Sequence, residues 1–200
     1  MDARLQIDGW AEAVHRERNE RDESWCEPFD EIAGVVVRHC TLIDLLRLQR
    51  AGNPFATRTP PVEVDKVTTF FARQFVLYLS RGYLDACALL RWFAKRRVNR
   101  IDPAQLIAEC ASYAKRTFCD DIGTTEGKKI EVTYWSVIAD YYHIMAGEYG
   151  MQLRDFEQMP YRRLMQMVRK TLKAKDPKQV FISESDRIVG DYLEKKNDGI

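Results

Sequence analysis

The sequence lacks a long apolar segment, since no stretch approaches the roughly 20 consecutive apolar residues that a membrane-spanning helix needs. Its start, MDARLQIDGW, carries an acid at position 2 and no continuous apolar run, so we expect no secretory signal. Charge of one sign is also not in excess, because 31 basic residues oppose 30 acidic ones. We therefore expect a cytoplasmic protein with no membrane partner, on which any nucleic-acid site would be a local patch.

Paired cysteines and suitably spaced histidines are missing as well. The five cysteines stand at irregular spacing without a CxxC pair: Cys26, Cys40, Cys87, Cys110 and Cys119. This pattern argues against a disulfide framework and against a structural zinc site. The histidines, His15, His39 and His143, do not share a spacing that would put two ligands on one helix face. We expect no metal, no cofactor, and cysteines that are reduced and mostly buried.

Helical periodicity runs along most of the chain, with only two short β-like runs, at residues 34–37 and 180–182. The pattern predicts an all-α protein: a single domain of about seven to eight packed helices in an irregular orthogonal bundle. We expect a charged N-terminal arm or helix at 1–37 and a helical core domain at 38–178. We expect a mobile loop at 120–131 within the core domain, and after that domain a C-terminal tail at 179–200 that could be helical.

Local signals place several helix ends. Thr41 is a good N-cap with Asp44 three residues on, and Gly52 supplies a left-handed stop for the leucine-rich helix between them. Asp102 followed by Pro103 opens another helix, which should run to about residue 118. Further helices are expected from about Glu63 to Leu79, from Tyr83 to Arg97, from about Val132 to Tyr149, and from Leu153 to Gln158.

Three arrangements could carry chemistry, and each has a simpler explanation. Residues 123–129 echo a phosphate-binding loop, but the glycine spacing is too short and the hydroxyl residue after the lysine is missing. Cys40 and His143 could form a nucleophilic pair, although a lone cysteine in a first helical turn is more often part of a core. Asp120–Asp121 with Glu109 could bind a metal, but a helix end and turn also favour such acids. We predict no catalytic residues, so an enzyme is the least supported class.

A basic amphipathic helix at residues 161–178 is the strongest local charge feature. Its cations alternate with apolar residues, and they are Arg162, Arg163, Arg169, Lys170, Lys173, Lys175 and Lys178. A cationic face of this kind can lie on phosphates or on an acidic partner, and it is also typical of an ordinary surface helix. A nucleic-acid-binding regulator that uses this helix is therefore our alternative function.

Two blocks of the sequence resemble the tail assembly chaperones and related minor tail proteins of long-tailed phages and prophages. The first block is Arg38-His39, a leucine-rich helix, the turn at 51–55 (AGNPF), a proline-containing spacer, and a helix that ends in Leu77-Tyr78-Leu79-Ser80. The second block runs from a Tyr-Gly pair at 149–150, through a short helix, to Met-Pro at 159–160 and the basic helix. Together the blocks cover about half of the chain.

The resemblance implies an all-helical, non-enzymatic protein that binds a long tape-measure protein while a phage tail is assembled. Under this hypothesis the partner-binding residues lie in the turn at 53–55 and in the Met-Pro basic helix. The residues are Asn53, Pro54, Phe55, Met159, Pro160, Tyr161, Arg162, Arg163, Met165, Met167, Arg169 and Lys170. The N-terminal arm and the C-terminal tail have no counterpart in the resemblance.

Overall fold

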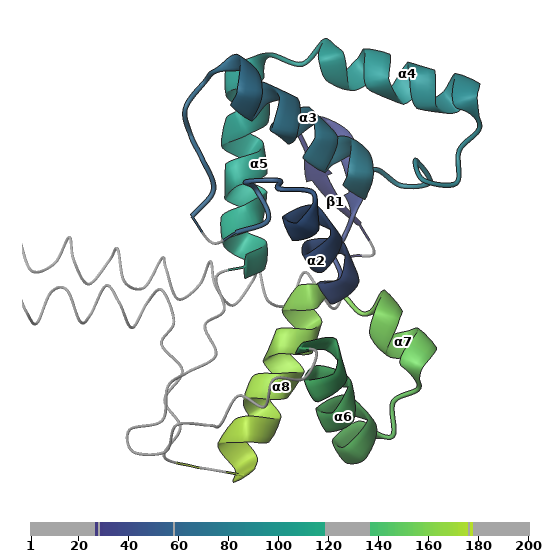
Figure 1. Cartoon of the computed structure of the whole chain (residues 1–200), viewed down its shortest axis with the longest axis vertical. Coiled ribbons are helices and arrows are strands. Elements are labelled where there is room, and N and C mark those ends of the chain that lie inside the picture. Colours follow the sequence, from purple (N-terminus) through teal and green to yellow (C-terminus); the bar gives the residue numbers. More distant parts are fainter. Residues whose placement is uncertain (1–26, 28, 58, 119–136, 176, 178–200) are drawn as a thin grey trace, which may run out of the picture.

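The computed structural model describes residues 27, 29–57, 59–118, 137–175 and 177, which contain seven helices and one two-stranded sheet (Figure 1). The prediction of a mostly helical fold is confirmed, with the small sheet as an addition to the all-α expectation. One continuous cluster of buried side chains extends from the sheet to the last described helix. Residues 1–26 of the expected N-terminal arm or helix, the loop at 120–131 and the tail at 179–200 lie outside the described residues.

An antiparallel hairpin begins the described fold and joins β1 (Phe29–Ile32) to β2 (Val35–Arg38). Its two-residue loop has positive φ angles at Ala33 and Gly34, as in the type I′ turns that match the twist of paired strands. Ile32 and Val37 are fully buried, whereas Val36 points outward. The hairpin thus contributes Ile32, Val35 and Val37 to the core, whereas the sequence pattern placed the residues up to 37 in a charged arm.

The hairpin leads directly into α2 (Leu42–Arg50), which begins where the sequence predicted. Thr41 and Asp44 form the reciprocal capping box, in which the Asp44 N–H donates to Thr41 Oγ1 at 3.2 Å. Three leucines of α2 are buried, and Gly52 follows the helix in a left-handed conformation, with φ of +67°. The N-terminal capping fixes the direction in which the chain leaves the sheet.

Most of the upper core in Figure 1 lies between α3 (Lys66–Leu79) and α5 (Pro103–Phe118). Asp65 caps α3 through its side chain, and Asp102 accepts from the Gln105 N–H at 3.0 Å, which confirms the predicted start of α5. Phe75 of α3 packs against the Tyr113 ring of α5 with centroids 5.8 Å apart. These two helices and the hairpin together enclose this upper part of the core.

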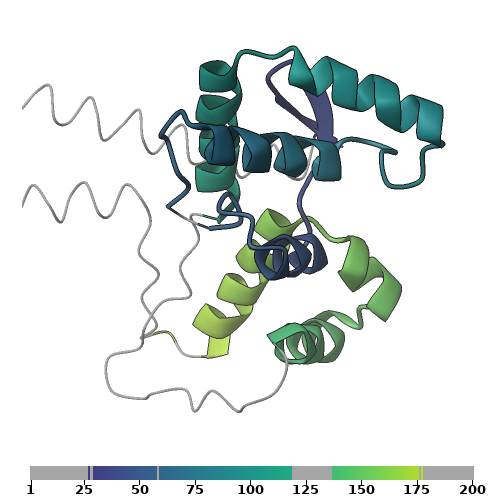
Figure 2. The same ribbon diagram turned by 45° about the horizontal axis from the view of Figure 1, so that its top comes forward.

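Helix α4 (Ala88–Asn99) lies at the edge of the molecule beside α3 (Figures 1 and 2). It begins five residues later than predicted, because the chain turns at residues 81–85 and Gly82 takes a positive φ. Val98 is the only buried residue of the helix. The position of α4 leaves its apolar side chains largely uncovered.

The last three described helices form a second group below the hairpin in Figure 1. They are α6 (Val137–Tyr149), α7 (Leu153–Gln158) and α8 (Tyr161–Lys175). The bounds of α7 agree with the prediction, and α8 matches the predicted basic helix as far as Lys175. α8 packs against both α5 and α6, and the rings of Phe118 and Tyr161 meet edge to face at 5.6 Å.

Candidate functional site

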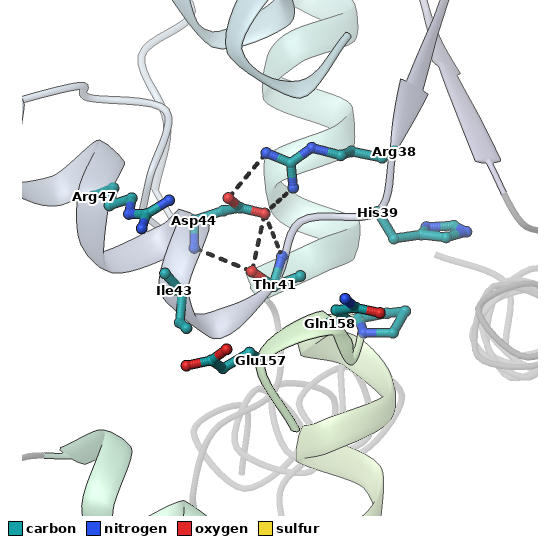
Figure 3. A pocket seen from close by; sticks show the side chains of 9 residues that line it. Arg38, His39, Thr41, Ile43, Asp44, Arg47, Glu157 and Gln158 are labelled. Carbon is teal, nitrogen blue, oxygen red and sulfur yellow. Dashed lines mark hydrogen bonds and ion pairs between the residues drawn. The ribbon is translucent and has the colours of Figure 1, made fainter. Parts of the chain in front are cut away.

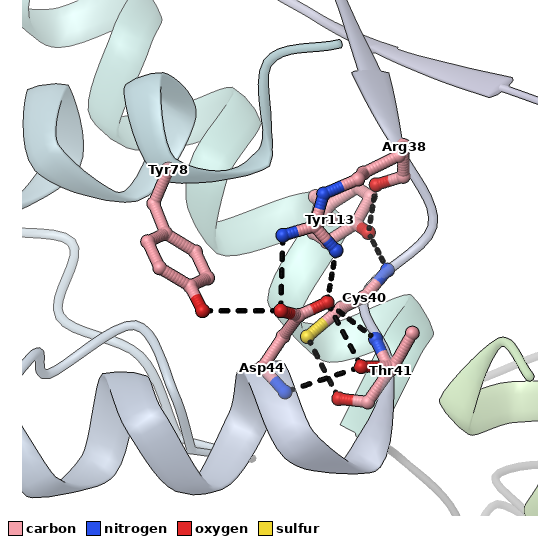
Figure 4. Close-up of polar contacts among 6 residues, drawn as sticks. All are labelled: Arg38, Cys40, Thr41, Asp44, Tyr78 and Tyr113. Carbon is pink, nitrogen blue, oxygen red and sulfur yellow. Dashed lines mark hydrogen bonds and ion pairs between the residues drawn. The ribbon is translucent and has the colours of Figure 1, made fainter. Parts of the chain in front are cut away.

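A buried polar network joins the end of β2 to the start of α2 (Figure 4). Arg38 donates to both carboxylate oxygens of Asp44, whose side chain also accepts from the Thr41 N–H at 3.1 Å and from Thr41 Oγ1 at 2.9 Å. The Tyr78 hydroxyl on α3 donates to Asp44 Oδ1 at 3.1 Å. Asp44 therefore ties the sheet, the α2 N-terminus and α3 together.

The charge of Asp44 is maintained although the residue is only 4% exposed. Burial by itself would raise the pKa of Asp44, but the hydrogen bonds and positive charge of Arg38, with the bonds from Thr41, outweigh it and lower the pKa below its usual value. Since the carboxylate uses both oxygens within the network, it is poorly placed to act as a general base. The arrangement is that of a structural ion pair.

Cys40 and Tyr113 form the inner side of the same network. The Cys40 N–H donates to the Tyr113 hydroxyl oxygen at 2.9 Å, and that hydroxyl reaches the Arg38 carbonyl at 3.4 Å. Burial raises the pKa of the Cys40 thiol well above its usual value, which keeps the sulfur protonated. His143, the partner considered from the sequence, is exposed on α6. The Cys40–His143 nucleophilic pair is therefore not supported by these environments.

The two sequence blocks that carry the phage resemblance meet next to this network. The Tyr161 N–H donates to the Cys40 carbonyl at 2.7 Å, and Thr41 forms an isolated antiparallel bridge with Pro160. A cleft of about 470 Å³ opens beside the junction (Figure 3). Its lining residues are Arg38, His39, Thr41, Ile43, Asp44, Arg47, Glu157, Gln158 and Pro160.

The cleft has mixed polarity and no catalytic arrangement in its lining. Arg38 and Asp44 neutralise each other, which leaves Arg47 and Glu157 as charges of opposite sign on facing helices. The His39 Nε2 atom lies 2.8 Å from the Glu27 carbonyl oxygen, a hydrogen-bond partner that is not among the residues lining the cleft. A lining of this kind suits a polar surface contact better than recognition of one charged ligand.

The predicted contact turn at residues 53–55 is largely buried. Asn53 donates from its amide to the Phe71 carbonyl at 3.0 Å, and its side-chain oxygen accepts from the Phe55 N–H at 3.0 Å. Phe55 is fully buried and packs against Phe75, whereas Pro54 is half-buried. The turn thus holds α2 against α3, and Asn53 and Phe55, both predicted as partner contacts, lie buried in this structure.

The predicted contact residues of the Met-Pro helix divide by exposure. Tyr161, Arg162 and Met165 are buried. Met159, Pro160, Arg163, Met167 and Arg169 are half-buried, and Lys170 is exposed. The helix directs its apolar side into the core, as an ordinary amphipathic surface helix does. Its described surface therefore offers a smaller cationic face than the sequence suggested.

Helix α4 presents an exposed apolar surface that the sequence pattern did not identify as a candidate contact site. Leu89, Leu90, Trp92 and Phe93 are 62, 59, 50 and 53% exposed. Contiguous exposed apolar groups of this kind mark interaction sites, whereas single exposed ones are normal. The clue in the sequence was the absence of polar residues between positions 88 and 93 other than Arg91, which equally fits a core helix.

Cations gather on the same helix. Lys95, Arg96 and Arg97 follow the apolar group, and all three are exposed. The Arg96 guanidinium lies over the Trp92 ring, 5.2 Å from its centroid, and Arg97 donates to the Gly34 carbonyl at 2.6 Å. Hydrophobic and cationic groups are thus presented together at one edge of the fold.

Of the residues considered for metal or phosphate binding, the structure describes only Glu109. Glu109 accepts hydrogen bonds from the Ala33 N–H and from Gln105, so it secures the hairpin turn to α5. Within the described ranges, no group of three or more His, Cys, Asp or Glu side chains could hold a metal ion. Asp120–Asp121 and the glycine-bearing loop at 123–129 lie outside these ranges.

Comparison with protein-family models, with curated proteins and with solved structures gave no match. None of the described helices combines the length and the apolar character that crossing a membrane requires. The assignment of a function therefore depends on the geometry of the surface and on the resemblance of the two sequence blocks.

Proposed function

We propose that this protein is a non-enzymatic interaction protein that presents α4 to a protein partner. One observation carries the proposal: four large apolar side chains lie within five residues of one helix, and each is at least half exposed. Complete burial of one such side chain contributes about 1.5–3 kcal/mol, so a partner that covers all four has a substantial driving force. Trp92 beside Arg96 also has the composition of an interface hot spot.

More specifically, we propose an assembly role in a phage or prophage, as a tail assembly chaperone that binds a tape-measure-like partner in the host cytoplasm. The support is the resemblance of the two sequence blocks, which contact each other through Cys40 and Tyr161. An exposed apolar helix suits a chaperone, because such proteins cover apolar segments of a partner before it is assembled.

The alternative, a nucleic-acid-binding regulator that uses residues 161–178, has weaker support. Arg162 is buried, and Lys175 forms an ion pair with Glu148, so few free cations of α8 face outward among the described residues. Retention on duplex DNA that depends on salt and on Lys170 and Lys173 would favour this alternative.

Co-expression with the product of the neighbouring large tail gene tests the proposal. We expect a complex that survives purification and that weakens about 30-fold for the Trp92→Ala/Phe93→Ala variant, since hot-spot truncations cost about 2 kcal/mol or more. Tyr149→Ala/Leu153→Ala is the matched control, because it also removes exposed apolar surface but changes residues of α6 and α7 instead of α4. Failure to recover a complex, or equal loss in both variants, would contradict the proposal.

A further inference from the structure

We infer that the α4 surface recognises an acidic amphipathic helix, an inference that rests on the function proposed above. The first argument is charge. Between residues 81 and 100 the chain carries six cations, Arg81, Arg91, Lys95, Arg96, Arg97 and Arg100, against a single acid, Asp85. None of the six forms an ion pair with another described residue. Within the part of the chain that the structure describes, the cluster is therefore not neutralised, although the overall charge of the chain is close to zero.

The second argument is the order of groups along α4. Its first half carries Leu89, Leu90, Trp92 and Phe93, and its second half carries Lys95, Arg96 and Arg97. Residues four apart lie on one face of a helix, so Arg96 stands one turn from Trp92, and Arg97 one turn from Phe93. A partner that lies along α4 meets apolar side chains first and cations next, and needs apolar groups flanked by carboxylates.

A helix is the partner element that fits this surface best. α4 packs on α3 and its C-terminal half also contacts the hairpin turn through Arg97, but Leu89 and Phe93 are 62 and 53% exposed, so a second helix can pack against the ridge that they form. An amphipathic helix supplies apolar anchors at the same three- and four-residue spacing. Glutamates next to those anchors would then reach the cations of α4.

Three other occupants fit less well. A second copy of α4 would place cations against cations in parallel packing, or cations against the apolar half in antiparallel packing. A lipid surface requires cations and apolar groups on opposite faces, whereas Arg96 shares a face with Trp92. A nucleic-acid base would compete with Arg96, which already covers the Trp92 ring, and with Phe93, whose ring lies 4.9 Å away.

The test uses the full-length protein and three labelled peptides of about 20 residues, each long enough to span α4 as a helix. All three carry leucines at positions i, i+3, i+4 and i+7, with glutamate, glutamine or lysine elsewhere. Fluorescence anisotropy should show the glutamate peptide binding about tenfold tighter than the glutamine peptide. The difference should shrink as salt is raised, because the contacts are exposed. The lysine peptide should bind weakest.

Matched variants separate charge from apolar contact. Lys95→Glu/Arg96→Glu should weaken the glutamate peptide about tenfold. The control Lys115→Glu/Arg154→Glu makes the same change in net charge at exposed sites on α5 and α7, and should leave affinity within about twofold. Trp92→Ala/Phe93→Ala should weaken the glutamate and glutamine peptides alike.

Each other outcome overturns the inference in an identifiable way. Equal binding of the glutamate and glutamine peptides, with loss in Trp92→Ala/Phe93→Ala, would leave the proposed function standing and refute acidic recognition. Absence of peptide binding while the tail-gene complex still depends on Trp92 would refute the helical partner. Tighter binding to phosphatidylserine vesicles or to a single-stranded oligonucleotide, or dimers that require Trp92, would assign the surface to that other occupant.

Discussion

Replacing Asp44 by alanine should destabilise the fold by about 3 kcal/mol, because one carboxylate serves an ion pair, a helix cap and a tyrosine hydroxyl. Hydrogen bonds to a charged group contribute about 1.5–3 kcal/mol, and loss of an N-terminal cap costs about 1 kcal/mol. Breaking a buried ion pair typically costs about 3–5 kcal/mol. The Asp44 side chain is 5% exposed and the Arg38 side chain 29%, so Arg38 can regain water and the low end applies.

Urea unfolding followed by far-UV circular dichroism measures this cost, with Glu157→Ala as a control on the same cleft. Glu157 is exposed, so its removal should change stability by no more than about 0.5 kcal/mol. In a double-mutant cycle, Arg38→Ala/Asp44→Ala should be less destabilised than the sum of its single variants by about 1 kcal/mol or more. A cost for Asp44→Ala below about 1 kcal/mol would refute the assigned role of the network.

The pH dependence has a definite sign. The pKa of Asp44 is lowered in the fold, so its contribution is complete above the unfolded value of about 3.9 and is lost as pH falls through the folded pKa. The difference in stability between the wild type and Asp44→Asn should therefore be constant from pH 7 to about pH 5. It should shrink below about pH 4, and a difference that grew on acidification would contradict this sign.

Three further predictions concern the core and the hairpin. Tyr113→Phe should cost about 1–3 kcal/mol in urea unfolding, because the buried Cys40 N–H loses its acceptor, whereas Tyr83→Phe should be nearly neutral. Peptide mapping after alkylation should show the exposed Cys87 modified well before Cys40, and faster labelling of Cys40 would reopen the enzyme hypothesis. Ala33→Asn should stabilise the fold by about 0.5–1 kcal/mol, and so raise the thermal midpoint, because asparagine tolerates the positive φ at this hairpin turn better than alanine does.

Elements with strong local signals could be predicted from the sequence. The Thr41–Asp44 capping box and the Asp102–Pro103 start each combine an acceptor side chain with a helix pattern, and both helices begin there. The first strand of the hairpin could not be found in this way. Asp30 and Glu31 have low β-propensity, and the strand exists because Val36 and its neighbours pair with it across the turn at Ala33.

The proposed contact surface was harder to predict than the fold. An apolar run such as Leu89 to Phe93 has the same appearance whether it is covered by other helices or not, since coverage is a tertiary property. Conversely, the turn at 53–55 resembles an exposed feature, but the Asn53 amide bonds to the Phe71 carbonyl and turns Phe55 inward. Only the packed structure distinguishes these two cases.

The hydrogen bond from the Tyr161 N–H to the Cys40 carbonyl has a consequence for how the protein is made. The two partners are separated by about 120 residues, which a ribosome adds in roughly 6 to 24 seconds. During that interval the nascent hairpin and α2 have emerged while α8, which closes the lower side of their core, has not been synthesised. Premature termination before Tyr161 should therefore leave a fragment with exposed apolar surface, which is prone to aggregation or proteolysis.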